Sequence, residues 1–95
     1  MSKVIYSSFF IRKARSLKKK HPSLINDLEK LENDLIKKPY QGSSLGGGLY
    51  KVRLAITSKG KGKSGGYRVI TYLTEQVDNE VIINMLTIYD KSEES

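Results

Sequence analysis

Several lysines and arginines in the C-terminal half of this sequence lie at positions that neighbouring strands could present together. Lys51 and Arg53 lie two residues apart in a stretch of alternating apolar residues, so both side chains should point to one face of a strand. Arg68 opens the next predicted strand, and Tyr89 and Lys91 end the last one. If these strands pair as an antiparallel meander, the five side chains can converge on one side of the sheet. Lysine, arginine and tyrosine together without an acid are typical of phosphate recognition.

The same residue types permit one reaction on a phosphodiester. RNA carries its own nucleophile, the 2′-hydroxyl, so cleavage needs a base, positive charge on the phosphorane and a proton for the 5′-oxygen. Arginine suits the stabilising role because it is planar and always charged, and a lysine crowded by other cations can act as a base. Histidine is the usual choice, but the single histidine, His21, lies at a predicted helix junction with no acid placed to orient it. Residue types alone therefore favour phosphate binding over cleavage, because basic patches bind far more often than they cut.

A segment rich in glycine and lysine follows the first of these strands. Residues 58–66 contain four glycines and three lysines, Lys59, Lys61 and Lys63, which add positive charge to the same region. The segment lacks the GxxxxGK[ST] spacing of a P-loop. The sequence also lacks paired histidines, an HExxH motif and an Asp-x-Asp cluster, so it predicts no metal site.

Positive charge dominates long parts of the chain, whose net charge is +7 over 95 residues. Residues 1–20 carry seven basic residues and no acid, and residues 41–74 carry six and no acid. Acid-free basic stretches of this length indicate a polyanionic partner. For the first stretch, on a predicted helix, a solvated surface is the favoured interpretation. The second stretch coincides with the candidate site, which favours a functional one.

Length and composition limit the class of protein. A chain of this length should form a single domain over residues 1–95. The absence of cysteine excludes disulfides and thiolate metal sites. The N-terminus has no signal-peptide pattern, and no apolar run approaches the ~20 residues of a membrane span. We therefore expect a soluble, cytoplasmic protein.

The elements that position the site begin with a short strand at residues 2–6 and two helices. Ser7 or Ser8 can cap a helix that runs to about Lys20. A second helix begins after the His-Pro break and stops before Pro39. Its apolar stripe follows steps of four, three and four, widened by two isoleucines: Leu24, Leu28, Leu31, Leu35, Ile25 and Ile36. Its acids should lie mostly on the polar face, balancing lysines: Asp27, Glu29, Glu32 and Asp34.

The pattern after Tyr40 changes from helical to strand periodicity. The glycines of residues 42–48 predict a loop, and strands are expected over 49–57, 67–74 and 81–89. In the first of these, the core residues should be Tyr50, Val52, Leu54 and Ile56. The last strand is apolar on both faces, as expected of a central, covered strand. The sequence thus predicts an α+β fold of order β-α-α-β-β-β, with a helical hairpin on one face of an antiparallel sheet.

The sheet half, Leu49 to Glu93, resembles the RelE superfamily of toxins, and most closely its HigB-like branch. The shared features are a K-x-R strand, a GKGKSGG loop, an arginine opening the next strand, and an apolar strand ending in Tyr-x-Lys. The resemblance implies a RelE-like domain with a small curved sheet. It also implies ribosome-dependent cleavage of messenger RNA in the A site, by 2′-hydroxyl attack, without metal or cofactor. A cognate antitoxin, expected to be a small helix-turn-helix protein, would neutralise the toxin.

The resemblance also implies roles for individual residues. Lys51 and Arg53 match a basic pair that contacts phosphate or serves as the base, and Arg68 matches the arginine that stabilises the transition state. Lys91 lies near a basic position with an acid or stabilising role, where arginine is common. Many members carry a stacking aromatic on a longer C-terminal tail, a role that Tyr89 would take here. The loop lysines match contacts with ribosomal or messenger RNA.

Two other functions are compatible with the same sequence. A ParE-like toxin shares the fold and binds gyrase without enzymatic activity, but such chains generally lack the concentrated cations of the K-x-R strand and the loop. A plain RNA-binding module usually shows interleaved aromatics. This chain has no tryptophan, and most of its six tyrosines fall at expected core positions.

Overall fold

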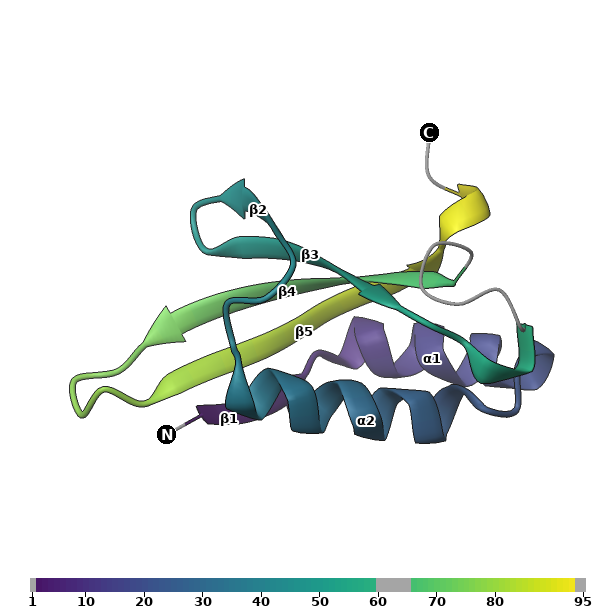
Figure 1. The fold of residues 1–95 in the computed structure, drawn as a ribbon, viewed down its shortest axis with the longest axis horizontal. Helices are drawn as coiled ribbons and strands as arrows, with labels where there is room; N and C mark the ends of the chain where they lie inside the picture. Colours follow the sequence, from purple (N-terminus) through teal and green to yellow (C-terminus); the bar gives the residue numbers. More distant parts are fainter. Residues whose placement is uncertain (1, 60–65, 94–95) are drawn as a thin grey trace.

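Two helices cover one face of a five-stranded sheet (Figure 1). The computed structural model describes residues 2–59 and 66–93. In chain order its elements are β1 (Ser2–Tyr6), α1 (Ser8–Lys20), α2 (Leu24–Lys37), β2 (Ser43–Gly46), β3 (Leu49–Leu54), the 3-10 turn η1 (Thr57–Lys59), β4 (Tyr67–Glu75), β5 (Val81–Asp90) and the 3-10 turn η2 (Lys91–Glu93). The strand order across the sheet is β1-β5-β4-β3-β2. The predicted α+β class and the helical hairpin on one face are confirmed.

The sheet contains two pairings that the sequence did not predict. Residues 42–48 were expected to be a loop, but β2 pairs antiparallel with β3. Glycines with positive φ, among them Gly46, Gly47 and Gly48, make the tight turn between these strands, and a glycine-rich composition hides a strand from propensity arguments. β1 pairs in parallel with β5, so the sheet is mixed rather than antiparallel. Because β1 and β5 lie far apart in the sequence, local periodicity gives no signal of their pairing.

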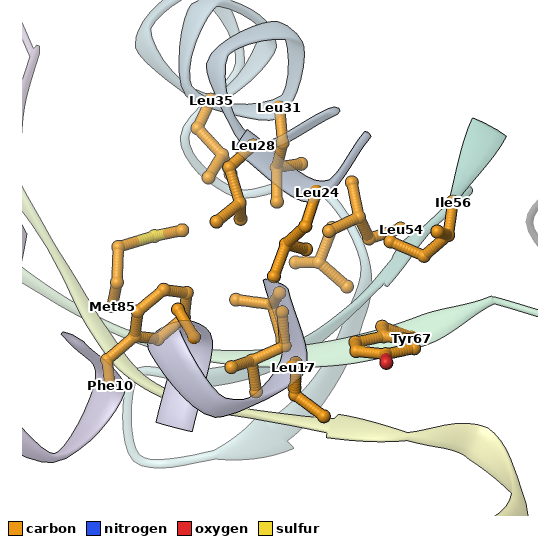
Figure 2. Close-up of a cluster of buried hydrophobic side chains, with 14 of the residues drawn as sticks. Phe10, Leu17, Leu24, Leu28, Leu31, Leu35, Leu54, Ile56, Tyr67 and Met85 are labelled. Atoms are coloured by element: carbon orange, nitrogen blue, oxygen red, sulfur yellow. The ribbon is translucent and has the colours of Figure 1, made fainter. Parts of the chain in front are cut away.

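The core lies between the helices and the sheet. Figure 2 shows the leucines of α2 and residues of α1 pointing toward side chains from β3, β4 and β5. The four predicted leucines of α2 are all buried, and so are Val52, Leu54 and Ile56 of the β3 region, while Tyr50 packs against this core. The period-two and helical patterns therefore identified most of the buried residues correctly.

The predicted widening of the α2 stripe was wrong. Ile25 and Ile36 are 43% and 41% exposed. At ~100° per residue, Ile25 is turned by about 100° from Leu24, away from the sheet. On the opposite margin of the stripe, Asp27 is buried at 5% exposure, although it was predicted on the polar face.

A bulge in β5 changes which of its side chains face the helices. Ile70 of β4 is paired with Thr87, but the next residue, Thr71, is paired with Met85, so Leu86 has no partner in this register. The alternation of side chains between the two faces is interrupted at Leu86. Before it, the buried side chains are those of the odd-numbered residues Ile83 and Met85, and after it the buried side chain is that of the even-numbered Ile88. The expected central position of β5 is confirmed, since this strand lies between β1 and β4. The expectation that both of its faces are covered was wrong, because the helices cover one face only.

Ser7 ties the bulge to the start of α1. Its Oγ accepts a hydrogen bond from the Phe10 N–H at 2.9 Å, which confirms the predicted cap. The same hydroxyl donates to the carbonyl oxygen of Leu86, the bulged residue, at 2.9 Å. One side chain thus stabilises both the helix terminus and the strand irregularity.

Replacing Ser7 with alanine should lower the free energy of unfolding by about 1–2 kcal/mol, because both hydrogen bonds are lost. Urea unfolding measures the change. Ser8→Ala, one residue along the chain, keeps the cap and is the matched control. An equal loss in both variants would contradict the role given to Ser7.

Candidate functional site

Three of the predicted site residues lie side by side across the sheet. Arg53 is paired with Arg68, and Arg68 with Tyr89. Directly opposed residues in antiparallel strands have Cα atoms about 4.5–5.5 Å apart and project to the same face. Their neighbours Val52 and Val69 are buried on the helix side, so this row lies on the face that the helices leave uncovered. We call it the open face.

The two predicted lysines lie close to this row. Lys51 is on the same face of β3 and opposite Ile70. Lys91 begins η2, and its backbone N–H donates to the carbonyl oxygen of Gly66 at 3.2 Å, which places it beside the start of β4. Figure 1 shows the ends of β3 and β5 and the beginning of β4 at the same end of the sheet. The residues Lys51, Arg53, Arg68 and Lys91 are called the basic cluster below.

The two arginines of the row differ in burial. Arg68 is only 4% exposed, and its Nη1 donates to the carbonyl oxygen of Tyr67 at 3.2 Å. Arg53 is exposed, Lys91 is exposed and Tyr89 is half-buried. Removing a guanidinium from water is costly unless it is held by polar groups. The arrangement therefore combines one buried guanidinium, fixed by a backbone carbonyl, with exposed cations beside it, and these residue types are suited to phosphate recognition.

A family model described as the RelE toxin of the RelE/RelB toxin–antitoxin system matches residues 2–95 of this chain. The chain belongs to the RelE family. It is therefore a toxin of a toxin–antitoxin system, and membership implies an antitoxin partner. The closer likeness to the HigB branch stays a prediction.

Part of the predicted site of this RelE-family toxin falls outside the described residues. Lys61 and Lys63 lie there, while Lys59 ends η1. Within the ranges 2–59 and 66–93, no helix is long and apolar enough to cross a membrane.

Asp27 anchors η1, which precedes Lys61 and Lys63 in the sequence, a role that the sequence did not reveal. Its carboxylate accepts hydrogen bonds from the Thr57 N–H at 3.0 Å, the Thr57 hydroxyl at 2.7 Å and the Ser23 hydroxyl at 2.8 Å. The Ser58 N–H in turn donates to the Ser23 oxygen at 3.0 Å. η1 is thereby held against the beginning of α2. The only signal in the sequence was the place of Asp27 on the margin of the leucine stripe.

The protonation of Asp27 follows from these contacts. Burial acts to raise the pKa of Asp27, but the hydrogen bonds from Thr57 and Ser23, together with the charge of Lys30, outweigh it and hold the pKa below its usual value. A lowered carboxyl pKa stabilises the fold above the pKa of the unfolded chain. That stabilisation is lost as the pH falls through the folded-state pKa.

The Asp27→Asn variant should be less stable than the wild type at neutral pH and should lose less stability on acidification. The amide keeps the size of the carboxyl but not its charge, so the proton-linked part of the stability disappears. Urea unfolding at neutral pH and at about pH 3, below the ordinary carboxyl pKa, measures both effects. Asp34→Asn, at an exposed position of the same helix, is the control. Parallel pH curves for the wild type and Asp27→Asn would contradict the assignment.

His21 lies apart from the basic cluster and has a structural role. It is half-buried at the C-cap of α1, as expected for a cap residue. Its ring meets the ring of Tyr67 edge to face, with 5.5 Å between centroids. Glu32, another acid predicted on the polar face of α2, accepts a hydrogen bond from the Tyr6 hydroxyl at 2.6 Å. Neither group contributes to the open face.

Proposed function

We propose that this toxin is an endoribonuclease that cleaves messenger RNA on the ribosome. The observation that carries the proposal is the cross-strand row of Arg53, Arg68 and Tyr89 on the open face. Two guanidinium groups on directly opposed residues can hold one phosphate from two sides. Lys51 and Lys91, at the same end of the sheet, supply groups for proton transfer.

The reaction follows from the residues of the basic cluster and the chemistry of RNA. Lys51 takes the proton of the 2′-hydroxyl as the 2′-oxygen attacks the adjacent phosphorus. Arg53 and Arg68 stabilise the charge that the phosphorane gains. Lys91 gives a proton to the 5′-oxygen as its bond to phosphorus breaks. The products are a 2′,3′-cyclic phosphate and a 5′-hydroxyl, and Tyr89 stacks on a base beside the cut.

Dependence on the ribosome is consistent with the weakness of these catalytic groups. Lysine and arginine hold their protons strongly at neutral pH, and the chain's single histidine, His21, packs against Tyr67 instead. A poor base needs a substrate that is already in an attacking geometry, and orientation of the reacting groups can supply a large part of the rate. We infer that the ribosomal A site provides this orientation, with Lys59, Lys61 and Lys63 contacting RNA.

The antitoxin that family membership implies should neutralise this activity by covering the basic cluster. The cluster lies in the acid-free stretch of residues 41–74, apart from Lys91. An acidic segment would complement these charges and would compete with the phosphates of RNA. We expect the antitoxin to be a small helix-turn-helix protein.

Expression of the chain alone tests the nuclease proposal. Growth and translation should stop, and primer extension should detect new messenger RNA ends where ribosomes are engaged. Purified protein should cut the same message on programmed ribosomes and leave the naked RNA largely intact. Cleavage of naked RNA at an equal rate would contradict ribosome dependence. Growth arrest without any new RNA ends would favour a non-enzymatic toxin.

A further inference from the structure

The open face extends well beyond the basic cluster. Next to the arginine row lies a row formed by Lys51, Ile70 and Thr87, and the row after that contains Leu49, Tyr72, Asn84 and Ile5. None of these paired residues, all within the described strands, is acidic. A polyanion bound at the arginines could therefore continue along this face without meeting a negative side chain.

Tyr72 is a large aromatic side chain on this face. It is 39% exposed, in contrast to its buried neighbours Thr71 and Leu73 on β4. Its ring lies against the backbone of Gly48 in the β2–β3 turn, where a Cβ atom would come within 3.3 Å of the ring. The Leu73 N–H donates to the Gly48 carbonyl oxygen at 2.9 Å, and this hydrogen bond joins the β2–β3 turn to β4. One edge of the ring thus lies next to a glycine, and the side chain remains accessible.

Asn84 lies directly opposite Tyr72 on β5. Its Nδ2 donates to the Tyr72 carbonyl oxygen at 2.9 Å, which fixes the amide next to the aromatic residue. An exposed aromatic with a fixed amide beside it is the combination with which sheet surfaces bind unstacked RNA bases. The stacking itself is tolerant of sequence, because every base has a π-face.

We propose that Tyr72 is a binding residue that stacks on the base of one nucleotide neighbouring the scissile phosphate, while Tyr89 contacts the base of the other. This inference rests on the nuclease function proposed above. Tyr72 is four residues from Arg68 on the same face of β4, a separation of about 13 Å along the strand. A single strand held by its phosphate at Arg53 and Arg68 can place an adjacent base over this ring. RNA is favoured over a protein partner because the paired residues of the described strands on this face combine cations and an aromatic without an acid.

Single-turnover cleavage on programmed ribosomes tests the role of Tyr72. Tyr72→Leu keeps an apolar cover over Gly48 but removes the π-face, and it should slow cleavage about fivefold or more, the range expected for the loss of one stacked base. Tyr72→Phe should cleave at nearly the wild-type rate. Tyr40→Leu changes a tyrosine that is 46% exposed and whose ring contacts Tyr50 of the core side, so it is the matched control and should have no effect. Tyr72→Met is the second variant if leucine destabilises the fold.

An abasic substrate separates stacking from a purely structural role. Removing from the substrate the base assigned to Tyr72 should slow cleavage by the wild type by about the same factor as the Tyr72→Leu substitution does. The same removal should not slow the Tyr72→Leu variant further. Equal slowing of both proteins, or wild-type rates for a folded Tyr72→Leu, would overturn the inference while leaving the nuclease intact. A change in the self-association of Tyr72→Leu relative to the wild type, measured by sedimentation, would also overturn the inference, because it would make this face an interface between copies. A wild type that fails to cleave on ribosomes would instead overturn the nuclease proposal itself.

Discussion

Replacing Arg68 with alanine should lower the rate of messenger RNA cleavage by about 10²- to 10³-fold, the loss expected when one group that stabilises transition-state charge is removed. Arg68 is the buried member of the arginine row, and its Nη1 is fixed by the Tyr67 carbonyl oxygen. A fixed guanidinium needs little rearrangement when the phosphorane charge develops. Single-turnover cleavage on programmed ribosomes measures the effect, and growth after induction gives the cellular counterpart.

Burial of Arg68 makes a stability control necessary. Thermal unfolding is followed for Arg68→Ala and for Arg68→Met, which better fills the space of the stem of the side chain. Arg68→Lys keeps the charge but lacks the planar fork, and should recover only part of the rate. Arg15→Ala removes the same charge from α1, away from the sheet, and should cleave normally. A folded Arg68 variant with the wild-type rate would remove this residue from the mechanism.

The parts of the fold that local patterns decide could be predicted from the sequence. The spacing of Leu24, Leu28, Leu31 and Leu35 fixes the buried side of α2, and the alternation around Val52 fixes the buried side of β3. Each pattern depends only on the geometry of one element. For the same reason the spacing of Lys51 and Arg53 alone places them on one face of β3.

The pairings between distant segments could not be predicted in this way. β1 pairs with β5 across almost the whole chain, and Asp27 is buried because Thr57, thirty residues later, donates two hydrogen bonds to it. A carboxylate is expected at the surface unless its partners are known. The sequence contains both partners, but nothing in their spacing shows that they meet.

The place of Tyr89 in the site depends on the bulge in β5, which local periodicity does not predict either. Uninterrupted alternation from Ile83 and Met85 would put Tyr89 on the helix side of the sheet. The bulge at Leu86 reverses the phase and brings Tyr89 opposite Arg68 on the open face. The sequence suggested that Tyr89 ends the last strand near the cations, while the bulge, held by Ser7, decides the face to which it belongs.

Replacing Lys61 and Lys63 together with alanine should weaken binding to ribosomes by about tenfold or more at low salt, with a smaller loss at high salt. Each lysine that neutralises an RNA phosphate adds about 0.7–0.9 to the slope of log affinity against log salt concentration, so the double variant should have a slope lower by about 1.5. Both lysines follow η1, which Asp27 holds against α2 through Thr57.

Lys18→Ala with Lys19→Ala removes the same charge from the last turn of α1 and is the control. Co-sedimentation with ribosomes over a range of salt concentrations measures both slopes. An unchanged slope in the Lys61/Lys63 variant, or an equal change in the control, would mean that the loop lysines do not contact RNA phosphates and that ribosome binding resides elsewhere on the toxin.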